Sequence, residues 1–394
     1  MLRVDRMHIV ESTKRVTLKG VNLGGWLMPE GYIMHAPNRG YRFFKENFIK
    51  SCGPAAFEEL QQAFRDNFIR EEDFAAIRRM GLNSIRLPFH YGLIEEAPFR
   101  YSKKGVGYLD RAIRWAGKND LRVILDMHAA PGAQNHDWHS DSDGQALFWT
   151  KKTFQDRACA LWRFLADRYK DEEAVAGYDL LNETVLPDVR PMVRWYQQAI
   201  NAIREVDRNH IIFAEGNHWA QHIECLQELT DNNLALGIHF YEPPEFTFNF
   251  IPGLKYPLGS GKKCWDRTFM RKRLDSYHKI AERLGRPLWC GEFGVNFRFG
   301  EAQEDKWLKD VLTHFKALDI HWHYWTWKAM KNCIFPDGVL SYYPNDPWVN
   351  RSGPLTGWDT WHLHWKDKKK AMIASWRTAA FSENKNISKV LRCH

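Results

Sequence analysis

The stretches GYDLLNETVLP (177–187) and RPLWCGEFGVN (286–296) both run through small or apolar residues and reach a glutamate, Glu183 in the first and Glu292 in the second. A short apolar run of this kind is typical of a strand buried on both faces of a parallel sheet. In parallel sheets and barrels, functional groups gather where the strands end. The two stretches therefore predict a parallel sheet with two carboxylates at its carboxyl edge.

The rest of the chain repeats this alternation of a short apolar run with a longer amphipathic stretch. The predicted strands are 16–26, 83–89, 122–128, 175–183, 210–216, 234–241, 286–293 and 320–327, and a last helix is expected over 369–381. Eight strands alternating with helices predict a (β/α)8 barrel, within one catalytic domain over residues 1–394. Residues 3–16 predict a short hairpin that closes the barrel floor. The long loops 129–151, 242–264 and 328–367 are expected to share the functional face.

Composition is that of a globular chain, with 44% hydrophobic and 26% charged residues. The net charge of +8 comes from Lys and Arg spread along the sequence, so no nucleic-acid partner is predicted. The basic run KDKKK (366–370) is interpreted as a solvated helix start. No apolar segment is long enough for a leader or a transmembrane helix, which predicts a cytoplasmic protein, or a secreted one if a leader was trimmed.

Cysteine and tryptophan positions add further expectations. The seven cysteines are widely spaced without a CxxC pair, which predicts mostly reduced, buried thiols and no zinc finger. Trp115, Trp162, Trp195, Trp307 and Trp376 fall in helical patterns and are expected in the core, and Trp26 is expected to pack beneath the first strand. Trp138, Trp149, Trp219, Trp265, Trp348, Trp358 and Trp361 lie in or near the loops, where three or four of them are expected to line a cleft.

The polar residues that end the predicted strands form a set with chemical meaning. They are Arg86, His128, Asn182, Glu183, His239, Tyr241, Glu292 and either Trp325 or Trp327. Paired carboxylates suit cleavage of a glycosidic bond, where one protonates the leaving oxygen and the other meets the sugar carbon. Glu183 is expected to be the acid/base, kept protonated by apolar surroundings or by its neighbour's charge. Glu292 is expected to be the nucleophile, kept ionised by Arg86 and Tyr241.

The motifs GVNLGGW, IRLPF, LDMHAAPG, LLNE, IHFY, GEFG and YWTWK, which span residues 16 to about 328, together resemble the retaining β-glycosidases of glycoside hydrolase family 5. The resemblance implies a carbohydrate substrate, no metal or organic cofactor, and the same roles for Glu183 and Glu292. It further implies that Arg86 and Tyr241 orient the nucleophile, His239 hydrogen-bonds near the acid, Asn182 binds the 2-hydroxyl of the sugar, His128 reaches an adjacent hydroxyl, and Trp325 forms the floor of that subsite.

Two motifs within the family point in different directions. The stretch NLGGWLMPE (22–30) is similar to the opening of exo-β-1,3-glucanases, which implies that Glu30 contacts the terminal sugar, and the loop 127–141 resembles the same group. GEFGV, in contrast, is closer to endo-acting cellulases and endoglycoceramidases. Glu30 and the first-strand motif favour exo-acting cleavage of glucan oligosaccharides or glucosides, and this is the expectation. An endo-acting glucanase, a mannanase and an endoglycoceramidase-like enzyme stay open, as does the oligomeric state.

Other classes of function are weaker alternatives. Asp126, His128, His136, Asp137 and His139 are close in sequence and could bind a divalent metal, but their spacing matches no helix-face motif. A carbohydrate-binding barrel without catalysis would be expected to lack one of the two glutamates. A phosphate-binding barrel would need a glycine-rich phosphate loop, which the sequence does not show.

Overall fold

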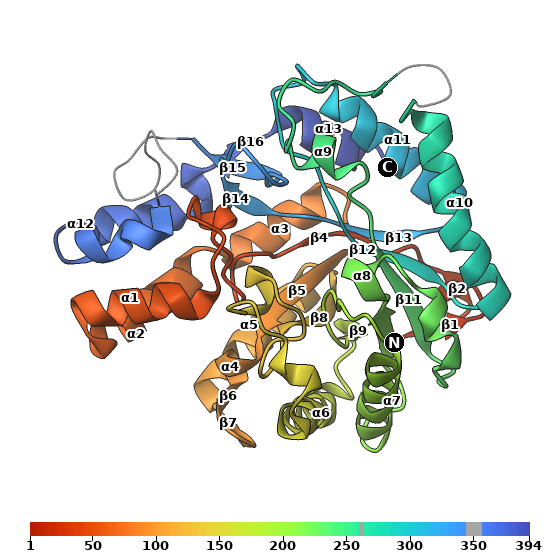
Figure 1. The fold of residues 1–394 in the computed structure, drawn as a ribbon, viewed down its shortest axis with the longest axis horizontal. Coiled ribbons are helices and arrows are strands. Elements are labelled where there is room, and N and C mark those ends of the chain that lie inside the picture. Colours follow the sequence, from red (N-terminus) through yellow and green to blue (C-terminus); the bar gives the residue numbers. More distant parts are fainter. Residues whose placement is uncertain (260–263, 344–356) are drawn as a thin grey trace.

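The computed structural model describes residues 1–259, 264–343 and 357–394 (Figure 1). Eight strands close a barrel, each parallel to its neighbours, in the order β4, β5, β8, β9, β10, β11, β12, β13. Their bounds are β4 Lys19–Asn22, β5 Ser84–His90, β8 Arg122–Ala129, β9 Val175–Asp179, β10 Ile211–Glu215, β11 Leu234–His239, β12 Leu288–Phe293 and β13 His321–Tyr324. The (β/α)8 prediction and all eight strands are confirmed, although the first, fourth and last strands are shorter than expected. The fourth, β9, ends at Asp179, so Glu183 follows the strand rather than ending it.

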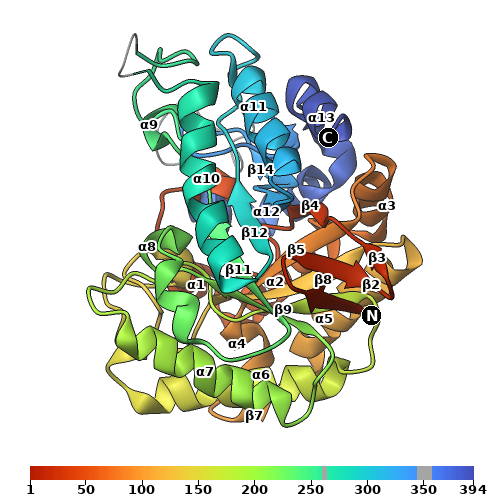
Figure 2. The same ribbon diagram turned by 90° about the vertical axis from the view of Figure 1, so that its right-hand side faces the viewer.

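Helices surround the barrel on its outside (Figures 1 and 2). The longer ones are α1 Tyr41–Cys52, α2 Pro54–Asn67, α3 Glu71–Arg79, α5 Lys103–Lys118, α6 Lys152–Tyr169, α7 Arg190–Arg204, α10 Arg267–Leu284, α11 Glu304–Ala317, α12 Trp361–Trp376 and α13 Lys385–Arg392. Short helices occur at α4 Tyr91–Ile94, α8 Asn217–Ala220 and α9 Pro244–Thr247. Helix α5 shows why such segments form, since the Ser102 hydroxyl caps the Gly105 amide at 3.2 Å and Leu109, Ala112 and Ile113 bury one face.

The N-terminal hairpin lies across the barrel floor, as the sequence predicts (Figure 2). It consists of β1 Leu2–Asp5 and β2 His8–Glu11, joined by β3 Lys14–Arg15. Leu2 and Ile9 are buried in a cluster with Ile211 and other residues from the amino ends of the barrel strands. The amide of Val4 also donates to Asn233 Oδ1 at 2.6 Å. The hairpin therefore seals the end of the barrel that does not carry the predicted site.

The C-terminal region differs from the prediction. Helix α12 begins at residue 361 rather than 369, so the KDKKK run lies inside a helix instead of starting one. Trp361 is buried rather than in the cleft, with its ring 5.0 Å from Trp376 and 6.0 Å from Phe64. The physical reason is spacing, because Trp361, Trp365 and Trp376 share one face of the helix, which packs on α1 and α2.

Two further small sheets lie outside the barrel. They are β6 Glu95–Ala97 with β7 Arg100–Tyr101, and β14 Lys328–Met330 with β15 Leu340–Tyr342 and β16 Ser382–Glu383. The seven cysteines, all in described segments, are free. Only Cys290 is buried, whereas four are partly buried and Cys333 and Cys393 are exposed, so the expectation of mostly buried thiols is wrong. Among the described helices, none is both long and apolar enough to cross a membrane.

Candidate active site

A cleft of about 790 Å³ opens at the carboxyl end of the barrel. Seven of the predicted site residues line it, namely Glu30, His128, Glu183, His239, Tyr241, Glu292 and Trp325. The other two, Arg86 and Asn182, are fully buried, and Arg86 Nη2 donates a hydrogen bond to Asn182 Oδ1 at 2.8 Å. The strand-end pattern thus located a set of side chains that the barrel does bring together.

Arg86 is the hub of the buried layer. Its guanidinium contacts four carboxylates, those of Asp126, Asp179, Glu215 and Glu292, at 2.8–3.0 Å. Burial opposes the charge of the guanidinium, but these acids raise the pKa of Arg86 well above its ordinary value. A fixed positive charge with five donors in one plane can hold several carboxylates at set positions.

Glu292, the last residue but one of β12, lies between two donors. Arg86 Nη1 donates to Oε1 and the Tyr241 hydroxyl donates to Oε2, both at 2.8 Å. Burial nevertheless raises the pKa of Glu292 above its ordinary value, against the lowering by His239 and Arg86, and the nearby Glu183 adds to the rise. The two donors leave this carboxylate oriented and ready to act as a nucleophile once it is ionised.

Glu183 does not sit in the apolar surroundings that the sequence suggested. His239 Nδ1 lies 2.6 Å from Oε1 and His139 Nε2 lies 3.3 Å from Oε2. Burial raises the pKa of Glu183, but the hydrogen bond and charge of His239 outweigh it, so the net direction is downward. The expectation of a carboxyl group kept protonated by burial is therefore wrong for the free site, because a histidine competes for that proton.

The two pKa directions favour a proton on His239 and a negative charge on Glu183 in the free site. Acidic neighbours raise the pKa of His239 well above its ordinary value against the effect of burial, led by Glu215. A short contact of 2.6 Å lets one proton sit on either His239 or Glu183, and such a pair titrates as a unit. A substrate that displaces water from the cleft favours the neutral form of the pair, in which Glu183 carries the proton.

Glu215 is a site residue that was not singled out from the sequence. It ends β10, is fully buried, and uses Oε1 to bind both Arg86 and His239 Nε2 at 2.9 Å. Its Oε2 accepts the backbone amide of Glu183 at 2.7 Å, where the chain adopts a φ of +43°. Burial would raise the pKa of Glu215, but His239 and Arg86 lower it to about 2. The same strand-end rule that selected Glu183 could have found it.

His128, Glu30 and Trp325 form the opposite side of the site. His128 Nδ1 lies 2.7 Å from Asp126, its Nε2 lies 3.4 Å from Glu30, and its ring stacks on Trp325 at 5.4 Å. Burial opposes the charged imidazole, but Asp126 and Glu30 raise the pKa of His128 to about 10. Trp325 faces the cleft, whereas the Trp327 indole donates to Asp73 on the helical side.

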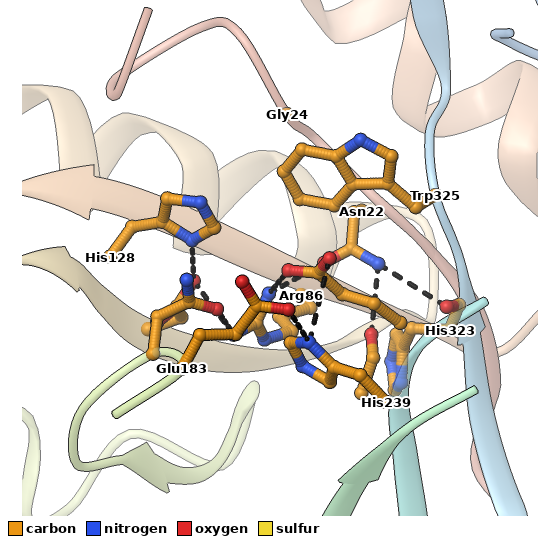
Figure 3. Close-up of polar contacts among 12 residues, drawn as sticks. Asn22, Gly24, Arg86, His128, Glu183, His239, His323 and Trp325 are labelled. Carbon is orange, nitrogen blue, oxygen red and sulfur yellow. Dashed lines mark hydrogen bonds and ion pairs between the residues drawn. The ribbon is translucent and has the colours of Figure 1, made fainter. Parts of the chain in front are cut away.

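The glycine pair of GVNLGGW accommodates this tryptophan. A Cβ at Gly24 would lie 2.9 Å from the Trp325 ring, and Gly25 has a φ of +77°, which favours glycine (Figure 3). Trp26 then turns away from the cleft, is buried, and stacks on Trp115. The motif thus ends the first strand and leaves room for the ring above it.

The cleft walls contain the expected tryptophans only in part. Trp138, Trp219 and Trp265 line the cleft, which agrees with the expected three or four. Trp149 is directed elsewhere, with its indole donating to the Gln134 carbonyl at 2.6 Å. Trp348 and the Trp358 side chain lie outside the described residues. The helical tryptophans Trp162, Trp195, Trp307 and Trp376 are buried as expected, and Trp115 is partly buried.

The histidine-rich loop does not form a compact metal-binding cluster. His128 pairs with Asp126 below the cleft, while His139 faces Glu183 and the side chain of His136 is half exposed. Within the described residues, the group close enough to share a metal ion is Glu183, His239 and Glu292, with one ligand atom of each within 4.8 Å of the others. Arg86 at 2.8 Å from Glu292 makes this a poor site for a dication.

The closed barrel and its two facing carboxylates, taken with the relatives below, define a (β/α)8 glycoside hydrolase. Residues 49–331 match the model of the family Cellulase (glycosyl hydrolase family 5). The chain belongs to this family.

Individual relatives differ in the activity that their names carry. The chain is 32% identical to a beta-xylosidase of Phanerodontia chrysosporium, over 83% of this chain and 70% of that protein. It is 28% identical to Endoglucanase C of Acetivibrio thermocellus, over 79% of this chain and 91% of that protein. The structure of Cel5A of Thermotoga maritima superposes with a TM-score of 0.63 at 20% identity, over 95% and 96% of the two chains.

Proposed function

We propose that this protein is a retaining, exo-acting β-glycosidase that removes one glucose-type residue, with Glu292 as nucleophile and Glu183 as acid/base. The observation that carries the proposal is the closeness of the two carboxylates, whose facing oxygens lie within 4.8 Å. Retaining enzymes hold their carboxyl groups about 5–5.5 Å apart, whereas inverting enzymes leave about 6.5–9.5 Å for a water molecule. The short separation supports a covalent intermediate rather than direct attack by water.

The surrounding groups suit two successive displacements. In the first, Glu292 attacks the anomeric carbon while Glu183 gives its proton to the leaving oxygen. The charge of Glu183 raises the pKa of Glu292, and this repulsion is mutual. Once Glu292 has become an ester the repulsion ends, so Glu183 more readily carries a negative charge and takes a proton from the attacking water in the second step.

The shape of the cleft supports exo action. Tyr32, Trp138 and Phe335 come from three different loops, and their ring centroids lie 5.0–5.9 Å apart. We call these three rings the aromatic wall. It stands beside Glu30 and Trp325, and the Trp325 indole donates to the Tyr32 hydroxyl. Under this proposal, the wall blocks further sugars beyond the one bound over Glu292.

The buried amide of Asn182 is suited to the sugar. Its oxygen accepts from Arg86, while its Nδ2 has no hydrogen-bond partner among the described residues. Glu30 Oε1, close to His128, makes no other hydrogen bond there either. A buried donor and a buried acceptor without partners are costly unless a ligand supplies them, and sugar hydroxyls can do both.

The test is hydrolysis of aryl β-glucosides, β-xylosides and β-mannosides and of cello-, laminari- and manno-oligosaccharides, with analysis of product size and of the first anomer released. Wild type is expected to release a β-configured monosaccharide. Glu292→Gln should lose nearly all activity. Glu183→Gln should lose about 10²–10⁴-fold on natural leaving groups but less on an activated aryl group that needs no proton.

The exposed Glu228 supplies a matched control, because Glu228→Gln makes the same chemical change outside the cleft and should leave the rates unaltered. Release of oligosaccharides from internal bonds would replace exo by endo action. An α-configured first product would overturn retention, and full activity of Glu292→Gln would remove the nucleophile assignment.

A further inference from the structure

All five N–H groups of Arg86 are used within the plane of its guanidinium. They donate at 2.8–3.1 Å to oxygen atoms of Asp179, Asn22, Glu292, Asn182 and Glu215. Hydrogen bonds of this kind fix the direction of the planar group, but they resist movement perpendicular to the plane less strongly. The position of Arg86 along that perpendicular therefore depends on what packs against its faces.

One face of this guanidinium packs over the indole of Trp289. The Cζ atom of Arg86 lies 5.7 Å from the ring centroid, within the range of a cation–π interaction. Trp289 is fully buried inside the barrel, where its ring packs against Phe213 at 4.8 Å. A Cβ at Gly291 would lie 2.8 Å from the Trp289 ring, so the missing side chain leaves the space that the indole fills. The indole thus supports Arg86 from inside the barrel.

His323 in β13 holds the polar edge of this indole. The Trp289 Nε1–H donates to His323 Nδ1 at 2.9 Å. A Cβ at Gly20, which is level with His323 in the neighbouring strand, would lie 2.6 Å from the imidazole, so this glycine leaves room for the ring. Burial, with Arg86 and His321 nearby, lowers the pKa of His323 well below its ordinary value. The ring is therefore neutral, and because an indole N–H can only donate, its proton lies on Nε2.

The His323 side chain makes no second hydrogen bond within the described part of the chain. Its Nε2 atom is buried and has no partner among the described residues. A buried N–H without a partner costs free energy, which an apolar side chain of similar size would avoid. The polar contribution of this imidazole is therefore its contact with Trp289. The His323 carbonyl accepts separately from Asn22 Nδ2 at 3.2 Å, a backbone link that a side-chain change leaves in place (Figure 3).

We propose that His323 is a positioning residue for the nucleophile, acting through Trp289 and Arg86. The imidazole sets the orientation of the indole, and the indole face limits movement of the guanidinium out of its own plane. The guanidinium in turn donates to Glu292 Oε1 at 2.8 Å. This inference rests on the proposed function, because Glu292 is taken there as the nucleophile.

The first experiment measures the pH dependence of kcat/KM for an aryl β-glucoside in His323→Leu, His323→Asn and Trp289→Phe. The leucine leaves the indole N–H without an acceptor, so Arg86 should shift and kcat should fall about 10–10²-fold. The Glu292 carboxylate then loses stabilisation, so the acid limb should move to higher pH. Trp289→Phe should change both in the same direction. The asparagine oxygen can take the place of Nδ1, so His323→Asn should recover most of the rate and the wild-type acid limb.

His321 supplies the matched control. It lies two residues earlier in β13 and is also buried, and burial lowers its pKa to about 4. Its Nδ1 accepts the Leu18 amide at 3.1 Å instead of a group near Arg86. His321→Leu should therefore lower stability without moving the acid limb. The groups that face Glu292 are the same in all these variants, namely Arg86, Tyr241, His239, Glu183 and His128.

An acid limb that stays in place in His323→Leu, or that moves as far in His321→Leu, would overturn the positioning role. Trp289→Phe keeps a ring in the core and applies the same criterion if His323→Leu is not recovered as a folded protein.

A second measurement needs no turnover and separates this inference from the proposed function. In a double-mutant cycle of unfolding free energies, Trp289→Phe and Glu292→Gln should be non-additive, because both contact Arg86 in wild type. His321→Leu and Glu292→Gln should be additive. Turnover by wild type with an additive Trp289 cycle would overturn the positioning role and keep the glycosidase. A non-additive cycle without turnover of any glycoside by wild type would retain the support of Arg86 and overturn the proposed function.

Discussion

His239 lies between both proposed catalytic glutamates, and its charge affects each of them. Its Nδ1 is 2.6 Å from Glu183 and 3.6 Å from Glu292, and its Nε2 is held by Glu215. As a cation it lowers the pKa of both glutamates against the effect of burial. The ionised nucleophile and the proton available to the acid therefore both depend on one imidazole.

This arrangement predicts the pH profile of His239→Asn. Glu292 must be ionised, and without His239 its pKa rises further, so the acid limb of kcat/KM moves to higher pH. In wild type the catalytic proton belongs to the pair of Glu183 and His239, and the pKa of His239 is raised. In the variant Glu183 holds that proton alone and loses it at lower pH, so the alkaline limb of kcat/KM moves to lower pH. The bell-shaped pH profile of kcat/KM should therefore narrow from both sides. His139 lies 3.3 Å from Glu183 and is not paired with Glu292, so His139→Asn should leave the acid limb nearly in place. An unchanged acid limb in His239→Asn would contradict the coupling.

Glu215 is predicted to be a positioning residue rather than one that touches the sugar. Glu215→Gln places an amide NH2 against donors on Arg86, His239 or the Glu183 backbone. The resulting repulsion should displace the Glu183 carboxyl group and lower kcat about 10²-fold. The pKa of His239 should also fall, because Glu215 is the main acid that raises it, so the alkaline limb should move to lower pH. A merely destabilising change would not move that limb.

The control for Glu215 is another buried carboxylate. Glu95 binds Arg157 at 2.6 Å away from the cleft, so Glu95→Gln should lower stability without moving the pH profile. Equal effects of both substitutions on the alkaline limb would show that Glu215 acts only through the fold.

At the residue level, the sequence predicted the positions better than the ionisation states. A residue near the carboxyl end of a barrel strand faces the open edge, which is why His239 and Glu292 could be located from the sequence, whereas Arg86 lies inside β5 and contacts carboxylates of the neighbouring strands within the barrel. The pKa of Glu183 depends first on burial and on His239, and then on His139, which comes from a long loop whose path no sequence period determines. The sequence therefore indicated which groups meet, but not which of them holds the proton.

At the level of elements, hydrophobic periodicity predicted the eight strands and most helices, because each strand is buried on both faces and each helix on one. It was less successful for α12, which begins eight residues before the expected start and lies with α1 and α2 at the left of Figure 1. No side-chain cap hydrogen bond at Thr360 marks the start of helix α12. The sequence assigns its first tryptophan to a cleft loop because it does not show that this residue packs on α2. The boundaries of such helices are set by tertiary contacts rather than by local signals.

Lys328, the first residue of β14, joins three separate elements. Its ammonium donates to the carbonyls of Phe68 and Trp376, at the ends of α2 and α12, and to the Thr378 hydroxyl at 3.1 Å. Burial lowers its pKa from 10.5 to about 8. Carbonyls at helix C-termini carry partial negative charge, which partly offsets the cost of burying this cation.

The pKa of Lys328 is lower in the folded protein than in the unfolded chain, and this determines how stability changes with pH. Between pH 8 and 10.5 the unfolded chain binds more protons at Lys328 than the folded protein, so this residue makes stability rise with pH. Across that range, the unfolding free energy of wild type should gain up to about 3 kcal/mol relative to Lys328→Met. Denaturant unfolding of both proteins at pH 7.5, 9 and 10.5 measures it. The exposed Lys389→Met should show no such trend. A constant difference between wild type and Lys328→Met would contradict the low pKa.

At the scale of the whole molecule, the barrel brings together loops that are far apart in sequence. Tyr32 follows the first barrel strand, Trp138 follows the third, and Phe335 follows the last, yet their rings are in contact. Neither composition nor spacing could have predicted these contacts, because each ring belongs to an irregular segment. The fold class followed from periodicity, but the shape of the cleft depends on how three loops meet.

The aromatic wall can be tested by opening it. Each of its three rings touches the other two, and Phe335→Ala should leave a gap beyond the subsite that holds the terminal sugar. If the wall enforces exo action, this variant should release disaccharides from cello- or laminari-oligosaccharides that wild type cuts only to monosaccharide. Trp138→Ala, which removes a second ring, should act in the same direction, whereas Phe43→Ala on the exposed side of α1 should not. Monosaccharide as the sole product of both wall variants would show that another part of the cleft sets the exo preference.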